Sequence, residues 1–157
     1  MGKEIERKFL VDDIKWNLLV KPVGKQLRQG YILTDPEKTI RVRQAENKGY
    51  LTIKGKNIGA TRLEYEYEIP VEEAKELLAQ FAVSELSKIR YAISFAGKTW
   101  EVDEFSGDNA GLIVAEIELD DENEAFEIPD WVTKEVTTEE KYYNSNLTLV
   151  PYKNWDI

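Results

Sequence analysis

The first strand-like segment of the chain carries side chains that can bind a metal ion and a phosphate group. At the two-residue period of a strand, Glu4, Glu6 and Lys8 share one face of residues 2–11. Hard divalent cations take carboxylate oxygens as ligands, and lysine pairs with phosphate as a point charge. A solvated strand face gives the same pattern, so this segment alone leaves both interpretations open.

The composition limits the chemistry that is available. The 157-residue chain contains no histidine and no cysteine, which excludes imidazole-bound zinc, thiolate nucleophiles and serine–histidine triads. Catalysis would therefore use carboxylates, Lys, Arg, Tyr and a hard ion such as Mg²⁺ or Mn²⁺. The net charge of −9 argues against nucleic acid or an anionic membrane as a partner. Because no apolar run is long enough to span a membrane and no signal sequence is visible, we expect a cytoplasmic protein.

Strand periodicity dominates the chain, which we interpret as a single domain over residues 1–157. Eight segments alternate with the period of a strand: 4–11, 26–33, 39–44, 50–55, 61–69, 86–95, 99–105 and 112–119. Helices are predicted at 13–19, 71–81 and 121–126, with a last one after a cap at 137–140. Most strands are joined by turns, so the pattern predicts an α+β, mostly β fold, with one antiparallel sheet closed or nearly closed into a barrel and a few flanking helices.

Most of these segments carry charged side chains on one face only. The acids are Glu4, Glu6, Glu64, Glu66, Glu101, Asp103, Glu116 and Glu118, and the bases are Lys8, Arg41, Arg43, Lys54, Lys88 and Arg90. If the apolar face points inward, the charges are solvated; if the charged face points inward, the barrel holds a wet lumen that needs a charged ligand and metals. Like charges two residues apart, such as Arg41 and Arg43, lie about 7 Å from each other and favour a group of opposite sign between them.

The order of several short blocks resembles the CYTH superfamily, also called triphosphate tunnel metalloenzymes. Residues 4–8 match its ExExK signature through Glu4, Glu6 and Lys8. Further blocks follow in order at 27–31, 41–43, 52–54, 64–66, 88–91, 101–103, 115–118, 134–137 and 141–144. The match covers essentially the whole chain, and it is most similar to the short bacterial members that hydrolyse inorganic triphosphate.

The resemblance implies an eight-stranded antiparallel tunnel with the charged face inward, and it implies a role for each charged residue. The metal ligands, for one or two Mg²⁺ or Mn²⁺ ions, would be Glu4, Glu6, Glu116 and Glu118, with Asp103 close by. The triphosphate would be bound by Lys8, Arg28, Arg41, Arg43, Lys54, Lys88 and Arg90, with Lys141 closing one end. Further tunnel acids would be Glu64, Glu66 and Glu101.

The same resemblance suggests a Lys88–Tyr31 dyad as the general base that activates water. A lysine crowded by arginines has a lowered pKa, whereas the nearby carboxylates oppose that effect. Arg28 and Tyr31 have opposite strand parity, so both can face the lumen only if the strand is bulged, and Gly30 is the expected place.

Other functions remain open at the level of the sequence. The same scaffold could serve an adenylyl cyclase or a thiamine or nucleoside triphosphatase, with Trp16, Trp131 or Trp155 stacking on the base. A non-catalytic polyphosphate-binding module would keep the basic residues and could lose the carboxylates, and a structural protein would bind neither phosphate nor metal. An outward apolar strand face would favour a homodimer, although flanking helices could cover it equally well.

Overall fold

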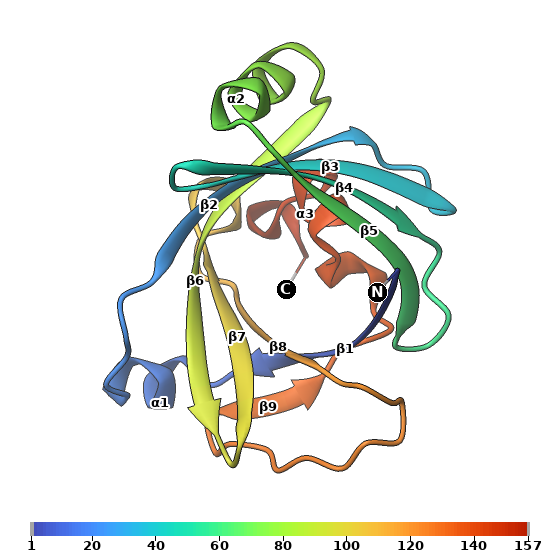
Figure 1. Cartoon of the computed structure of the whole chain (residues 1–157). Helices are drawn as coiled ribbons and strands as arrows, with labels where there is room; N and C mark the ends of the chain where they lie inside the picture. The colour runs from blue at the N-terminus through green and yellow to red at the C-terminus, as the bar shows by residue number, and fades with distance from the viewer. Residues whose placement is uncertain (1, 157) are drawn as a thin grey trace.

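Antiparallel strands make up most of the fold in the computed structural model, which describes residues 2–156. The strands in that range are β1 (Lys3–Val11), β2 (Lys25–Leu33), β3 (Lys38–Ala45), β4 (Lys48–Gly55), β5 (Thr61–Ile69), β6 (Ser84–Phe95), β7 (Lys98–Phe105), β8 (Ile113–Glu118) and β9 (Val132–Glu135). Their order in the sheet is β5-β4-β3-β2-β6-β7-β8-β1-β9, and a further pairing of β5 with β1 closes the ring. Figure 1 shows the barrel from one end.

The strand β1 forms the seam of the barrel. Its first residues pair with β5, where Glu4 lies opposite Arg62, and its later residues pair with β8, where Lys8 lies opposite Glu116. The sequence prediction of an eight-stranded antiparallel barrel is confirmed for β1 to β8. The sequence did not predict the additional strand β9. It pairs with Phe9 and Val11 of β1, beyond the residues of β1 that pair with β5.

Short helices cover the outside and one end of the barrel. They are α1 (Asp13–Leu18), α2 (Val71–Gln80) and α3 (Asn144–Leu149), with 3-10 turns η1 (Gly107–Asn109), η2 (Glu140–Tyr142) and η3 (Tyr152–Asn154). The N-cap of α1 is Asp12, whose side chain accepts a hydrogen bond from the Lys15 backbone N–H. None of the helices within residues 2–156 has the length and apolar character that a membrane crossing requires.

Two helix predictions are wrong. Residues 121–126 form a turn, because the Asp121 side chain accepts from the Asn123 N–H and the Glu124 side chain accepts from the Asp120 N–H, which replaces helical bonding. The predicted last helix is divided into η2 and α3 by an extended residue, Tyr143. The C-terminal segment therefore bends across the barrel end, as the red ribbon in Figure 1 shows.

Most of the apolar core lies outside the ring of strands, and the rest closes one end of the lumen. One cluster lies between α1, β9 and the outer faces of β1, β7 and β8, and it contains Trp16, Trp100 and Trp131. A second cluster lies under the C-terminal segment and includes Phe105 and Val114, which share the inward strand face with the lumen residues. A third cluster lies under α2. The apolar face of the strands therefore points outward into the first and third clusters, and the charged face lines the rest of the lumen.

The packing of α2 depends on a glycine in β2. A Cβ at Gly30 would lie 2.8 Å from Leu78 Cδ2 and 2.9 Å from Ala82 Cβ, so the strand accepts α2 at this distance only without a side chain. The expected bulge at Gly30 is absent, since Gln29, Gly30 and Tyr31 pair in regular register with β3. The register shift falls after Tyr31 instead.

Candidate functional site

A cavity of about 270 Å³ occupies the lumen, and charged side chains from nearly all strands of the barrel line it. Its acidic residues are Glu4, Glu6, Glu64, Glu66, Glu101, Glu116 and Glu118, and its basic residues are Lys8, Arg41, Arg43, Lys54, Arg62, Lys88 and Arg90. Tyr143, Asn144 and Ser145 of the C-terminal segment also line the cavity. The structure thus brings together most of the side chains that the sequence singled out.

Two carboxyl groups from neighbouring strands meet on the acidic side. Burial, followed by the charge of Glu116, raises the pKa of Glu6 well above its usual range, and the two groups share a hydrogen bond. Burial also disfavours ionisation of Glu116, but the hydrogen bond from Glu6 and the charges of Lys8 and Arg90 outweigh it, so the pKa of Glu116 lies well below its usual range. The two carboxyl groups therefore lie together at a position that suits a cation.

Two further acids lie near this pair. Burial raises the pKa of Glu4, and Glu64 and Glu116 add to the effect against the opposing charge of Lys54. The pKa of Glu118 is raised by burial and then by the charges of Glu4 and Glu101. In both cases the carboxylate charge lacks full compensation from the protein, which is favourable for binding a positive ion.

The side chains from β3 provide a cationic wall. Arg43 donates to a neutral group, the Gln29 Oε1, through Nε at 3.0 Å and Nη2 at 2.8 Å. Burial, followed by the charges of Arg41 and Arg90, lowers the pKa of Arg43 to about 9. Arg41 reaches Glu66 and Thr52 through Nη2, whereas its buried Nε has no acceptor among residues 2–156. Positive charge and donors are therefore left available on this wall.

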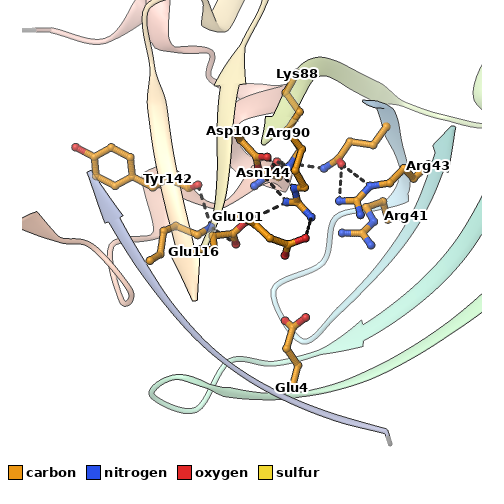
Figure 2. A network of polar contacts seen from close by, with 12 residues as sticks. Glu4, Arg41, Arg43, Lys88, Arg90, Glu101, Asp103, Glu116, Tyr142 and Asn144 are labelled. Carbon is orange, nitrogen blue, oxygen red and sulfur yellow. Dashed lines mark hydrogen bonds and ion pairs between the residues drawn. The ribbon is translucent and has the colours of Figure 1, made fainter. Parts of the chain in front are cut away.

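A compact ion-pair group lies between the two sides (Figure 2). Arg90 binds both carboxylate oxygens of Asp103, at 2.8 and 2.9 Å, and also reaches Glu101 and Glu116. Lys88 Nζ lies 2.8 Å from Asp103 Oδ2 and 2.7 Å from Asn144 Oδ1. Arg90 is thus compensated by carboxylates, in contrast to Arg43.

Burial sets the protonation of this group. It lowers the pKa of Lys88 to about 7, and the charges of Arg90 and Arg43 act in the same direction against the pull of Asp103. Burial would raise the pKa of Asp103, but Arg90 and Lys88 reverse this and lower it to about 2. Asp103 therefore carries the negative charge, and Lys88 titrates near neutral pH.

Three of the predicted site residues do not line the cavity. Arg28 points out of the barrel and pairs with Glu85 through two hydrogen bonds, because Gln29 and Tyr31 take the inward parity of β2. Lys141 is exposed and lies over the rings of Tyr142 and Trp155 rather than at the cavity. Asp103 is fully buried, and both of its oxygens are engaged by Arg90 and Lys88, which supports a positioning role over that of a metal ligand.

The remaining predicted bases lie in the cavity wall beside acids. Lys54 lies between Glu4 and Glu64, at 3.5 and 3.3 Å. Lys8 lies 3.9 Å from Glu116, with its Nζ 3.4 Å from the Tyr142 carbonyl oxygen. Both are held where they can pair with an anion in the lumen.

Some residues of the site were not predicted from the sequence. Arg62 shares the parity of Glu64 and Glu66 on β5, so strand alternation alone could have identified it. Gln29 and Asn144 contact the charged groups but are themselves neutral, and a search for charge overlooks them. Tyr31 lines the cavity as expected, and its Oη accepts from Gln29 Nε2 at 3.3 Å.

Comparisons with known proteins agree with this geometry. The CYTH domain family matches residues 2–151. The chain is 54% identical over 156 residues to an inorganic triphosphatase from Acetivibrio thermocellus, with 99% of each chain covered. It is 34% identical over 154 residues to an inorganic triphosphatase from Nitrosomonas europaea, with 93% of this chain and 97% of the relative covered. A crystal structure of an inorganic triphosphatase superposes with a TM-score of 0.65 at 32% identity, covering 95% of this chain and 96% of the other. With a closed barrel, a charged lumen and a family match along nearly its whole length, the chain belongs to the CYTH domain family.

Proposed function

We propose that this protein is an enzyme that hydrolyses inorganic triphosphate to pyrophosphate and phosphate inside the barrel, with Mg²⁺ or Mn²⁺ as cofactor. The inorganic triphosphatases that align with it over nearly its whole length support this reaction. The observation that carries the proposal is the division of the lumen into an acidic side on β1 and β8 and a cationic wall on β3. A polyphosphate held with metal ions matches both sides at once.

The cationic wall supports binding of a highly charged anion. Arg43 is half-buried next to other arginines and hydrogen-bonded to an uncharged amide, and no carboxylate within residues 2–156 is in direct contact with its charge. Leaving such a cation unpaired is costly, and a phosphate group would remove the cost. Guanidinium groups also bind phosphate oxygens in a fixed planar geometry, which lysine cannot reproduce. The remaining bases, Lys8, Lys54 and Arg90, would bind the other phosphates.

The acidic side fits a hard divalent ion by the chemistry of its donors. Glu6 and Glu116 are in hydrogen-bonding contact, and Glu4 and Glu118 lie on the same two strands. Within residues 2–156 no three acidic side chains are already grouped around one metal position, so these four residues would gather when the ion and the substrate bind together. An ion held there would neutralise charge on the phosphate oxygens and on the leaving group.

Lys88 would accept the proton of the attacking water. A neutral amine has two N–H donors and one lone pair. Asp103 Oδ2 and Asn144 Oδ1 can take both donors, which leaves the lone pair for a water in the cavity. The lowered pKa makes the neutral amine available near pH 7. Tyr31, whose Oη accepts from Gln29, keeps its own hydroxyl proton to donate to substrate or water.

The lining argues for an inorganic substrate over a nucleotide or thiamine ester. Tyr31 and Tyr143 are the aromatic residues that the described chain contributes to it. The tryptophans considered as stacking surfaces lie elsewhere: Trp16 and Trp131 are packed in the outer apolar cluster, and Trp155 packs against Tyr142 and Tyr152. A cavity lined mainly by charged groups offers little for an adenine or thiazolium ring.

Phosphate release from tripolyphosphate tests the proposal, with Mg²⁺ or Mn²⁺ and with EDTA as the metal-free control. We expect Arg43→Met to lower kcat/KM by at least about 30-fold, because it removes a buried charge from the anion site. The matched control is Arg28→Met, which changes an outward arginine and should retain activity within about threefold. Equal losses in the two variants, or hydrolysis that persists in EDTA, would contradict the assignment.

A further inference from the structure

We propose that the side-chain amides of Gln29 and Asn144 act as one positioning unit, which orients the substrate-binding arginine and the base together. This inference rests on the proposed triphosphatase function and adds two neutral residues to it. The unit joins four elements, because Gln29 lies on β2, its partner Arg43 on β3, Lys88 on β6 and Asn144 at the start of α3.

Gln29 is fully buried and uses both ends of its amide. Its Oε1 accepts from Arg43 Nε and Nη2, at 3.0 and 2.8 Å. Its Nε2 donates to Tyr31 Oη at 3.3 Å and to Asn144 Oδ1 at 3.2 Å. Arginine has only donors, so the oxygen of Gln29 must face Arg43 and the nitrogen must face the other two groups. The orientation of this amide is therefore fixed by chemistry.

Asn144 extends this hydrogen-bond network to Lys88. Its Oδ1 accepts from Lys88 Nζ at 2.7 Å as well as from Gln29 Nε2. Because the oxygen serves two donors, the Nδ2 group of Asn144 is left for the cavity that the residue lines. The same contact sets the direction of the Lys88 lone pair, which depends on where the two N–H groups are held.

The neutrality of both residues matters for the anion site. A carboxylate in place of Gln29 could hold Arg43 as firmly, but it would cancel the charge that a phosphate needs. Arg90 shows that alternative, since Asp103, Glu101 and Glu116 all surround it. An amide fixes the guanidinium and leaves its charge uncompensated. Gln29 therefore suits a residue that must be ordered before the substrate arrives.

The unit also links the base to the C-terminal segment. Asn144 follows the extended residue Tyr143, which directs it toward the lumen. A hydrogen bond of 2.7 Å between the hydroxyl groups of Ser84 and Thr148 holds α3 against β6, the strand that carries Lys88. The position of α3 thus affects the position of the Lys88 amine through the side chain of Asn144.

A double-mutant cycle tests the unit with the full-length chain, Mg²⁺ and tripolyphosphate. We expect Gln29→Met to lower kcat and raise KM, each at least about tenfold, because it releases both Tyr31 and Arg43. Asn144→Leu should lower kcat by at least about tenfold with a smaller change in KM, since it acts on Lys88. The kcat of the double variant should be at most about threefold lower than the kcat of the less active single variant, because the residues act as one unit. Gln44→Met, on the outer side of β3, is the control and should stay within about twofold.

Two further measurements keep the outcome decisive. If Gln29→Met does not fold, Gln29→Glu replaces it, since this isosteric change keeps the acceptor for Arg43, removes the donor for Tyr31 and Asn144, and cancels the Arg43 charge. The Arg43 Nε–H signal in ¹⁵N NMR, assigned with Arg43→Lys, should be protected from exchange in the wild type and lost in Gln29→Met, whether or not the protein turns over tripolyphosphate. Wild-type kinetics in both single variants, losses that multiply in the double variant, or an Arg43 signal unchanged by Gln29→Met would overturn the proposal.

Discussion

At the scale of single residues, three arginines of the same barrel are used in three ways. Arg28 forms an outward ion pair with Glu85, Arg90 is compensated by several buried acids, and Arg43 is held by a neutral amide. Only the last arrangement leaves a full positive charge beside the lumen, so we assign the strongest contribution to phosphate binding to Arg43.

Lys88 provides a prediction for the pH dependence. Its pKa of about 7 lies below the usual lysine value, so the neutral amine forms as pH rises through that value. We therefore expect kcat/KM for tripolyphosphate to rise with pH through about 7 and then level off. Lys88→Ala should lose turnover by at least about 1,000-fold and retain tripolyphosphate binding in calorimetry. The control is Lys75→Ala, which changes an exposed residue of α2. Near wild-type activity in Lys88→Ala, or a rate that falls as pH rises through this range, would exclude Lys88 as the base.

Glu116 provides a prediction for the metal. Glu116→Gln removes one of two carboxyl groups that are in contact on the acidic side, so we expect the Mg²⁺ or Mn²⁺ concentration for half-maximal rate to rise at least about tenfold. Asp103 still pairs with Arg90 in this variant, so the fold should persist, with Tm within about 5 °C of the wild type in EDTA. An unfolded variant, or an unchanged metal titration, would instead assign Glu116 a structural role.

Charge and parity identified most of the site from the sequence, and the exceptions have physical reasons. The family resemblance placed Arg28 in the lumen, but β2 continues without a bulge at Gly30, and Gln29 takes the inward position. Lys141 lies in a 3-10 turn, where no strand period indicates its direction. Gln29 and Asn144 are uncharged, and their roles follow only from the contacts that bring β2, β3, β6 and α3 together.

At the scale of elements, the barrel is inverted relative to a half-solvated sheet, with polar side chains inside and apolar side chains outside, except at the end that the C-terminal segment closes, where Phe105 and Val114 point inward. The strand periods were sufficient to predict β1 to β8 and α2, because alternation and helical spacing are local properties. They could not predict β9, which is four residues long and is defined by its pairing with β1. The alternation pattern also could not predict whether the charged face points into the lumen or toward solvent, because the pattern is the same in both cases.

The contact between α2 and β2 gives a prediction at this scale. Gly30→Ala places a Cβ within 3 Å of Leu78 and Ala82, so α2 must shift, and we expect the free energy of unfolding to fall by about 1–3 kcal/mol. The matched control is Gly55→Ala, where the nearest atom would be 3.6 Å away, an ordinary contact. Urea unfolding measures both variants. Equal stabilities would mean that α2 does not require the close approach at Gly30.

At the scale of the whole molecule, the fold concentrates charge of both signs in a closed ring. The chain has a net charge of −9, yet Arg41, Arg43, Arg62 and Arg90 line its lumen. An anion that binds only to the folded barrel stabilises it in proportion to the logarithm of its concentration. In EDTA, tripolyphosphate at 100 times its Kd should therefore raise Tm by about 5–10 °C. Arg43→Met should largely abolish this shift at the same concentration, and an equal shift in both proteins would show that the anion binds elsewhere.

The central claim is that the lumen acts on inorganic triphosphate. The most direct test compares the hydrolysis of tripolyphosphate, ATP and thiamine triphosphate by the wild-type protein under the same conditions, with Mg²⁺ and then with Mn²⁺. Because the cavity is lined mainly by charged groups and the tryptophans lie outside it, we expect kcat/KM for tripolyphosphate to exceed that for either ester by at least about tenfold. An equal or faster reaction with ATP or thiamine triphosphate, or no hydrolysis of tripolyphosphate with either metal, would contradict the claim.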